Sequence, residues 1–144
     1  MTKSNRHAQH GDPSTDENLA QIFGDFYARI QSDGRRVLKD LNLPAGSRVL
    51  DVGTGVGTFA TFLAIEGHTV TTGEPSSDDT HYAGKAWAEN AERAGVRDRL
   101  EFVDFDAARM PFEDGAFAAV FFFGVLHHVD PPDRRAALAE ALRV

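Results

Sequence analysis

Residues 49–59 read Val-Leu-Asp-Val-Gly-Thr-Gly-Val-Gly-Thr-Phe, and this stretch decides the fold. A short β-rich apolar run is followed by glycines at three alternate positions: Gly53, Gly55 and Gly57. Residues 58–64 then place apolar side chains at helical spacing. The stretch therefore predicts a strand, a glycine-rich turn and a helix. Because glycine lacks Cβ, such a turn can approach a ligand closely, and the helix that follows offers unpaired N–H groups to an anionic group.

The spacing of these glycines separates two kinds of ligand. A dinucleotide fingerprint, G-x-G-x-x-G counted from Gly53, needs glycine at position 58, where the sequence has Thr58. The third glycine is instead Gly57, and the pattern from Asp51 is D-x-G-x-G-x-G. This pattern resembles motif I of the class I S-adenosylmethionine-dependent methyltransferases. The alternative is a turn without a ligand, which is disfavoured because three glycines cost chain entropy with no local gain.

Length and composition limit the classes of protein. A chain of 144 residues predicts one domain, and 42% hydrophobic residues are enough for a buried core. A net charge of -7 disfavours nucleic-acid binding, and the lack of cysteine excludes disulfides and thiolate chemistry. The N-terminus lacks a secretory signal, and the longest apolar run, 116–126, is too short to cross a bilayer. We therefore expect a cytoplasmic protein without membrane, nucleic-acid or metal partners.

The first third of the chain predicts helices. Residues 1–12 are polar and predict a disordered tail, and residues 13–47 form a predicted helical extension. Ser14 starts a capping-box pattern, and apolar residues recur at helical spacing over 19–30. We expect that helix to end at Asp33-Gly34 and a second, short helix to cover 35–41.

The remainder, 48–144, predicts alternating strands and helices. Strands are predicted near 48–52, 68–72, 100–103 and 117–123, and helices over 57–66, over 80–94 and from 130 onward. This order favours an α/β fold, a parallel sheet with helices on both faces. The resemblance implies a Rossmann-like sheet with the strand order 3-2-1-4 for the strands present.

Acidic residues after the strands are candidate ligand contacts. Glu74 closes the second strand, where an acid can accept hydrogen bonds from both ribose hydroxyls. The resemblance implies that Asp106 binds the adenine amino group and that Ala107 supplies a backbone N–H. Asp104 is a rival for this contact with the adenine. The alternative for Asp106 is a structural role, in which its side chain caps its own turn. Asp51 is expected to accept N–H bonds of the glycine loop or to meet the ammonium group of the cofactor.

The segment after the fourth strand resembles that of methyltransferases related to the quinone-biosynthesis enzymes. Gly124 would let the backbone approach the cofactor closely. His127 or His128 would deprotonate an acceptor hydroxyl, because imidazole titrates near neutrality. The alternative is one structural and one exposed histidine. Phe23 and Tyr27 are both expected to pack in the core, and closure of one of them over the cofactor is the alternative.

The resemblance also implies strands beyond Val144, so we expect a truncated domain whose fourth strand is an exposed, apolar edge open to self-association or to a partner chain. The leading hypothesis is methyl transfer from S-adenosylmethionine to a small-molecule acceptor, with S-adenosylhomocysteine as product. A catalytically incomplete module that binds the cofactor or a partner is the second hypothesis. A nicotinamide-dependent oxidoreductase is the third, and Thr58 disfavours it.

Overall fold

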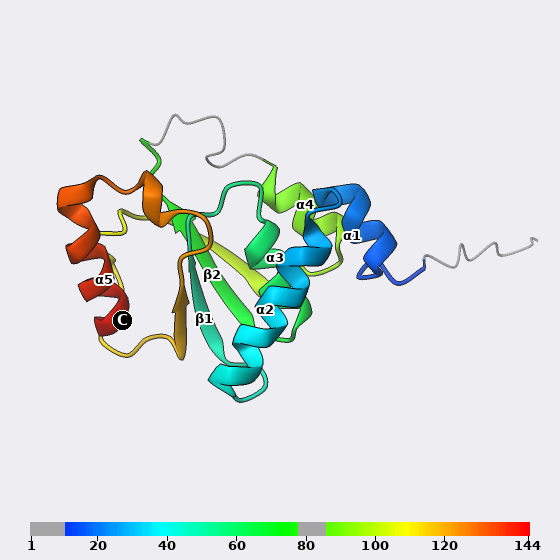
Figure 1. The fold of residues 1–144 in the computed structure, drawn as a ribbon, viewed down its shortest axis with the longest axis horizontal. Coiled ribbons are helices and arrows are strands. Elements are labelled where there is room, and N and C mark those ends of the chain that lie inside the picture. Colours follow the sequence, from blue (N-terminus) through cyan, green and yellow to red (C-terminus); the bar gives the residue numbers. More distant parts are fainter. Residues whose placement is uncertain (1–10, 78–85) are drawn as a thin grey trace, which may run out of the picture.

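The structure, a computed structural model, describes residues 11–77 and 86–144 (Figure 1). Its α-helices are α1 (Asp16–Phe23), α2 (Tyr27–Leu41), α3 (Thr58–Ile65), α4 (Trp87–Arg93) and α5 (Arg134–Arg143). Its strands are β1 (Arg48–Val52), β2 (Thr69–Glu74), β3 (Leu100–Asp104) and β4 (Ala119–Phe121). Short 3₁₀ turns cover Arg97–Arg99, Leu126–His128 and Pro131–Asp133. None of the helices in the described ranges is long and apolar enough to cross a membrane.

The four strands form one parallel sheet in the order β3-β2-β1-β4. This confirms the predicted α/β fold and strand order. In Figure 1, α5 covers one face of the sheet, and α2, α3 and α4 lie on the other. The central strand β1 is buried from Val49 to Val52, as expected of a parallel strand covered on both faces.

Two apolar clusters hold the layers together. Alternate residues of a strand face opposite sides of a sheet, so Val49 joins the cluster under α2 and α3, whereas Leu50 and Val52 join the cluster under α5. The fully buried Phe62 of α3 belongs to the first cluster, and Ala137 of α5 belongs to the second. By the same alternation, Asp51 faces the side of α3.

The predicted break in the N-terminal helices is wrong. The first helix ends at Gly24, which has a φ of 85°, and α2 then runs through Gly34 without interruption. Position 34 requires a glycine although it lies inside a helix, because the ring of Phe62 occupies the space that a Cβ would need. The N-cap of α1 is Thr15, whose hydroxyl accepts the Asn18 N–H, and not Ser14.

Two further boundaries differ from expectation. The fourth strand is only three residues long, Ala119–Phe121, and these residues pair in register with residues 49–51 of β1. Within the predicted helix over 80–94, residues 80–85 lie outside the described residues, and α4 begins at Trp87. The predicted tail, 1–12, likewise lies almost entirely outside the described part of the chain. The domain boundaries themselves stay predictions.

Candidate functional site

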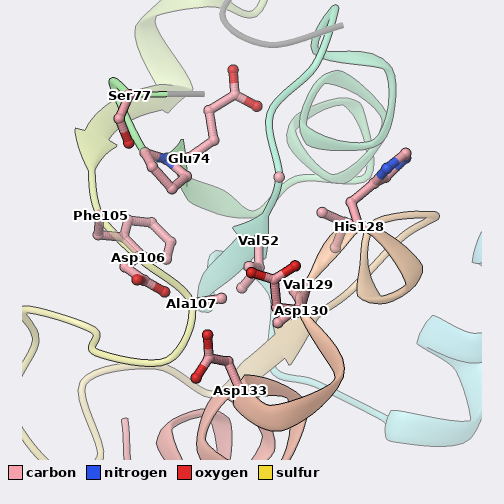
Figure 2. Close-up of a pocket in the computed structure, with 14 residues that line it drawn as sticks. Val52, Glu74, Ser77, Phe105, Asp106, Ala107, His128, Val129, Asp130 and Asp133 are labelled. Atoms are coloured by element: carbon pink, nitrogen blue, oxygen red, sulfur yellow. The ribbon is translucent and has the colours of Figure 1, made fainter. Parts of the chain in front are cut away.

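Two adjoining cavities lie where β1, β2 and β4 end. The first measures about 300 Å³ and is shown in Figure 2; the second measures about 550 Å³. Four residues border both cavities: Gly53, Glu74, Val125 and His128. The chain order reverses between β1 and β4, and in open parallel sheets this switch point at the carboxyl ends is where ligands bind.

The loop between β1 and α3 requires its glycines. Gly53 and Gly57 have φ values of 92° and 83°, a region that residues with a Cβ rarely adopt. A Cβ on Gly53 would also overlap the side chain of Val125, and one on Gly57 would lie 3.1 Å from the Trp87 Cα. The Gly53 N–H donates to the Gly73 carbonyl over 2.8 Å, which fixes the loop on β2. The result is a closely packed backbone cradle at the mouth of both cavities.

Glu74 is the last residue of β2, and only 8% of it is exposed. Its Oε2 accepts the Gly55 N–H over 3.1 Å, so one carboxylate oxygen orients the glycine loop. The sequence placed Glu74 at the ligand site, and the structure places it on the border of both cavities. Asp51 is expected from the sequence to accept N–H bonds of this loop. For Gly55 this is wrong, because the Gly55 N–H donates to Glu74.

Asp51 lies beneath the glycine loop and borders neither cavity. Only 1% of Asp51 is exposed. Its Oδ2 accepts a hydrogen bond of 2.9 Å from the Thr72 hydroxyl. The Thr72 and Thr54 hydroxyls are themselves hydrogen-bonded to each other. Its Oδ1 has no hydrogen-bond partner among residues 11–77 and 86–144. Burial raises the pKa of Asp51 to about 7, the Thr72 bond opposes this, and the charge of Glu74 adds to it.

The pKa of Asp51 predicts a pH-dependent stability. An acid with a folded-state pKa near 7 and an ordinary pKa when unfolded stabilises the fold at low pH, and this stability is lost as pH rises from about 4 to about 7. The isosteric Asp51→Asn variant lacks this loss. We therefore expect the difference in free energy of unfolding, variant minus wild type, to increase by on the order of 2 kcal/mol between pH 5 and pH 8. Urea titrations of both chains at the two pH values measure the difference, and a constant difference would contradict the raised pKa.

The predicted adenine-contact residues, Asp106 and Ala107, border the first cavity. The Asp106 Oδ1 also accepts the Ala108 N–H over 2.8 Å, so the turn-capping alternative holds as well. Its rival Asp104 borders neither cavity, and its Oδ1 accepts the Ser76 N–H over 2.8 Å. The structure therefore favours Asp106 over Asp104.

Sequence reasoning missed two acids of the first cavity. Asp130 and Asp133 flank the two prolines that start the last helix, and Figure 2 shows both beside the cavity opposite Phe105 and Asp106. The two prolines lie in the 3₁₀ turn Pro131–Asp133, directly before α5. The signal that could have found these acids is their position a few residues after His127 and His128.

Gly124, His127 and His128 border the second cavity. The two imidazole rings are exposed and lie 3.9 Å apart between centroids, each free to meet a ligand from solvent. No group of three potential metal ligands lies together in the described ranges, so the pair has no third ligand there. Phe23 borders this cavity, whereas Tyr27 is buried in the core and stacks on Phe23 at 5.4 Å.

Asn90 of α4 is a third residue that the sequence did not reveal. It is 8% exposed, and its Nδ2 donates to the Val56 carbonyl over 2.9 Å. Val56 lies between two glycines of the loop, so this bond holds the outer half of the cradle against α4. Nothing in the local sequence marks such a contact, because it depends on how α4 packs on the loop.

The chain matches a known family and named relatives. Residues 49–144 match the family described as methyltransferase domain. The 27-O-demethylrifamycin SV methyltransferase of Amycolatopsis mediterranei is 35% identical, over 89% of this chain and 47% of the relative. A demethylmenaquinone methyltransferase of Clavibacter sepedonicus is 37% identical, over 69% of this chain and 37% of the relative. The chain thus spans less than half of the length of these relatives.

A solved structure shows the same fold over nearly the whole chain. It is a Methanococcus maripaludis protein assigned to the S-adenosyl-L-methionine-dependent methyltransferases, with a TM-score of 0.70. The alignment covers 99% of this chain and 62% of that one, at 19% sequence identity. At this identity the likeness concerns the fold, and it includes the two N-terminal helices.

Proposed function

Because the chain belongs to the class I S-adenosylmethionine-dependent methyltransferase family, we propose that it binds S-adenosylmethionine and passes the methyl group to a small-molecule acceptor. The observation that carries this proposal is the position of Glu74. Its carboxylate holds the glycine loop through Gly55 and borders both cavities at the end of β2. The names of the two curated relatives, which both state small-molecule acceptors, support the acceptor class.

The residues present fit this cofactor. The loop from Gly53 to Gly57 is packed against Val125 and Trp87 with no room for a Cβ at Gly53 or Gly57, and backbone of this kind can approach a ligand closely. Glu74 offers carboxylate oxygens to ribose hydroxyls, and Asp106 with Ala107 offers an acceptor and an N–H to the adenine. Asp51 lies beneath the loop, and we propose that it holds the cradle through the hydroxyls of Thr72 and Thr54 rather than touching the ligand.

When bound, S-adenosylmethionine would supply a methyl group bonded to a sulfonium. A nucleophile that attacks the methyl carbon displaces the sulfur as a neutral thioether. The chain contributes mainly by positioning, because bringing two reactants together in line removes much of the entropic barrier. Gly124 permits the backbone after β4 to border the reaction site closely. His127 or His128 takes the proton of the acceptor, since both imidazoles face the second cavity.

The histidines give a test of the proposed activity. A panel of phenols, amines and carboxylic acids is incubated with the chain and tritiated S-adenosylmethionine, and labelled product is measured. With a phenol acceptor, the double variant His127→Gln/His128→Gln is expected to transfer methyl groups about 100-fold more slowly at pH 7. The loss should shrink near pH 10, where a phenol ionises without a base.

The outcomes of this assay separate the hypotheses. Equal loss at both pH values would contradict the role as base and indicate a positioning role for the two residues. A chain that binds the cofactor but labels none of the panel would support the catalytically incomplete module. Nothing in the family match favours a nicotinamide-dependent oxidoreductase.

We further propose that the outer edge of β4 mediates self-association. Among the described strands, only β1 pairs with β4, so one edge is open. Beside it, Val37 of α2 and residues 121–123 border a third cavity of about 210 Å³ with almost entirely apolar walls. A partner chain at this edge, like the cytoplasmic location and the absence of nucleic-acid partners, stays a prediction.

Sedimentation equilibrium tests the open edge. We expect an average mass above the 15.7 kDa of one chain that rises with protein concentration. Val37→Glu should shift the chain toward the monomer, because it adds a charge to the apolar wall. Leu142→Glu, on the 91% exposed Leu142 of α5, is the matched control and should leave the mass unchanged. A wild-type chain that is monomeric at every concentration would contradict self-association.

A further inference from the structure

We infer that the acceptor for the second cavity is an uncharged, planar aromatic compound that carries a hydroxyl group. This inference names the substrate class of the proposed methyl transfer and rests on that proposal. Three properties of the cavity carry it: aromatic walls, the sign of the charges around it, and the histidines at its mouth. Each is considered in turn.

The second cavity has aromatic walls drawn from three parts of the chain. Phe23 comes from α1, Phe26 from the turn before α2, Phe59 from α3, and Phe123 from the segment after β4. The rings of Phe59 and Phe123 are parallel to within 6° and lie 4.7 Å apart between centroids. Phenyl faces and edges pair favourably with another aromatic ring at such distances. A flat aromatic ligand can therefore contact several of these rings at once.

These walls expose apolar surface that a folded chain usually buries. Phe26 is 60% exposed, Val56 41% and Phe123 39%, and all three border this one cavity. Single exposed apolar side chains are common, but several around one concave site mark a place for an apolar partner. The cavity of about 550 Å³ is within the range of small-molecule sites and has room for an acceptor beside part of the cofactor.

The charges around the site argue against an anionic acceptor. Among the described residues that border the two cavities, there is no lysine or arginine. Of the acids there, Glu74 borders both cavities, whereas Asp106, Asp130 and Asp133 border only the first. A carboxylate or phosphate on the acceptor would thus enter a largely apolar cavity beside the Glu74 carboxylate, without a lysine or arginine to pair with, which is unfavourable. An uncharged acceptor avoids this penalty.

The histidines define the nucleophile. His127 and His128 border the same cavity as the phenyl rings, and imidazole is a suitable base for a hydroxyl that ionises near pH 10, as phenols do. In the transfer, the acceptor oxygen gives its proton to an imidazole and forms a bond to the methyl carbon. The carbon–sulfur bond breaks, and its electron pair stays on sulfur, which becomes a neutral thioether. The imidazolium then returns its proton to water.

The probe is 2-naphthol, titrated calorimetrically into the chain with and without saturating S-adenosylhomocysteine. The comparison ligand, 2-naphthoate, has the same rings with a carboxylate in place of the hydroxyl. We expect saturable binding of 2-naphthol and at least about tenfold weaker binding of 2-naphthoate. Equal or tighter binding of the carboxylate would overturn the inference.

Ring variants locate the binding site. Phe26→Leu keeps the apolar volume but removes the ring, and it is expected to weaken 2-naphthol binding about fivefold. The affinity for S-adenosylhomocysteine should change less than about twofold, because Phe26 is not one of the residues proposed to hold the cofactor and does not border the first cavity, where the adenine would lie. Leu142→Ala, far out on α5, is the control and should change neither affinity. Unchanged 2-naphthol binding in Phe26→Leu would overturn the assignment to this cavity.

The two titrations distinguish this inference from the proposed function. A chain that binds S-adenosylhomocysteine but not 2-naphthol contradicts the acceptor class and leaves the cofactor site intact. A chain that binds 2-naphthol but not S-adenosylhomocysteine supports the aromatic cavity and contradicts the cofactor site. Binding of neither ligand by the folded chain overturns both.

Discussion

Glu74→Gln is expected to weaken the binding of S-adenosylhomocysteine about 100-fold while the chain stays folded. The amide oxygen of glutamine can still accept the Gly55 N–H, so the loop keeps its orientation. The second position becomes an NH₂ group, which cannot accept the hydrogen bonds that ribose hydroxyls donate to a carboxylate. Each hydrogen bond to a charged group contributes about 1.5 to 3 kcal/mol, and the loss follows from one or two of them.

The matched control for Glu74→Gln is Glu101→Gln on β3. Glu101 is an exposed acid of the neighbouring strand, and its substitution removes the same charge without touching either cavity. Isothermal titration and thermal melting are compared for the three chains. We expect Glu101→Gln to bind like the wild type. If Glu74→Gln binds S-adenosylhomocysteine with an affinity within threefold of the wild type, Glu74 does not contact the cofactor. The proposed function would then lose its main support.

Gly73→Ala is expected to be the most destabilising of the substitutions considered, lowering the free energy of unfolding by about 3 kcal/mol. The added Cβ would overlap the Val103 carbonyl oxygen and lie 2.5 Å from Cε1 of the Phe105 ring. Neither neighbour can yield easily, because Val103 is paired with Gly73 in the sheet and Phe105 is buried. The Gly73 carbonyl also accepts the Gly53 N–H, so a displaced strand would carry the glycine loop with it.

Thermal melting measures this effect. For a domain of this size the loss corresponds to a melting temperature lowered by about 10 °C. Gly11→Ala is the control, since a Cβ there has nothing within 4 Å. A Gly73→Ala chain that melts with the wild type would show that β2 and β3 do not pack as described.

The parts of the fold that follow from neighbouring residues could be predicted from the sequence. The β1–loop–α3 unit depends on an apolar run, three glycines and a helical pattern that are contiguous in the chain. Glu74 could be placed because the end of a strand fixes the edge of the sheet on which its last side chain lies. The parallel order of the strands then brings these parts together.

The errors and omissions concern contacts between residues far apart in the chain. A glycine in a helix is read as a break, yet Gly34 is required because Phe62 packs against it from another helix. Asn90 has an ordinary sequence context, and its role comes from its bond to Val56 across 34 positions. Asp51 has the position of a ligand contact in the sequence, but the hydroxyls of β2 and of the loop enclose it. Such features depend on packing, which spacing along one chain does not reveal.

The most direct test of the central claim is a calorimetric titration of the chain with S-adenosylhomocysteine, with NADH as the competing nucleotide and Gly55→Arg as the variant. Gly55 has a φ of 51° and its N–H bonds Glu74, so an arginine there would disrupt the cradle. We expect saturable binding of S-adenosylhomocysteine that is lost in the variant, and no saturable binding of NADH. A folded wild-type chain that binds NADH, or that binds neither nucleotide, would contradict it.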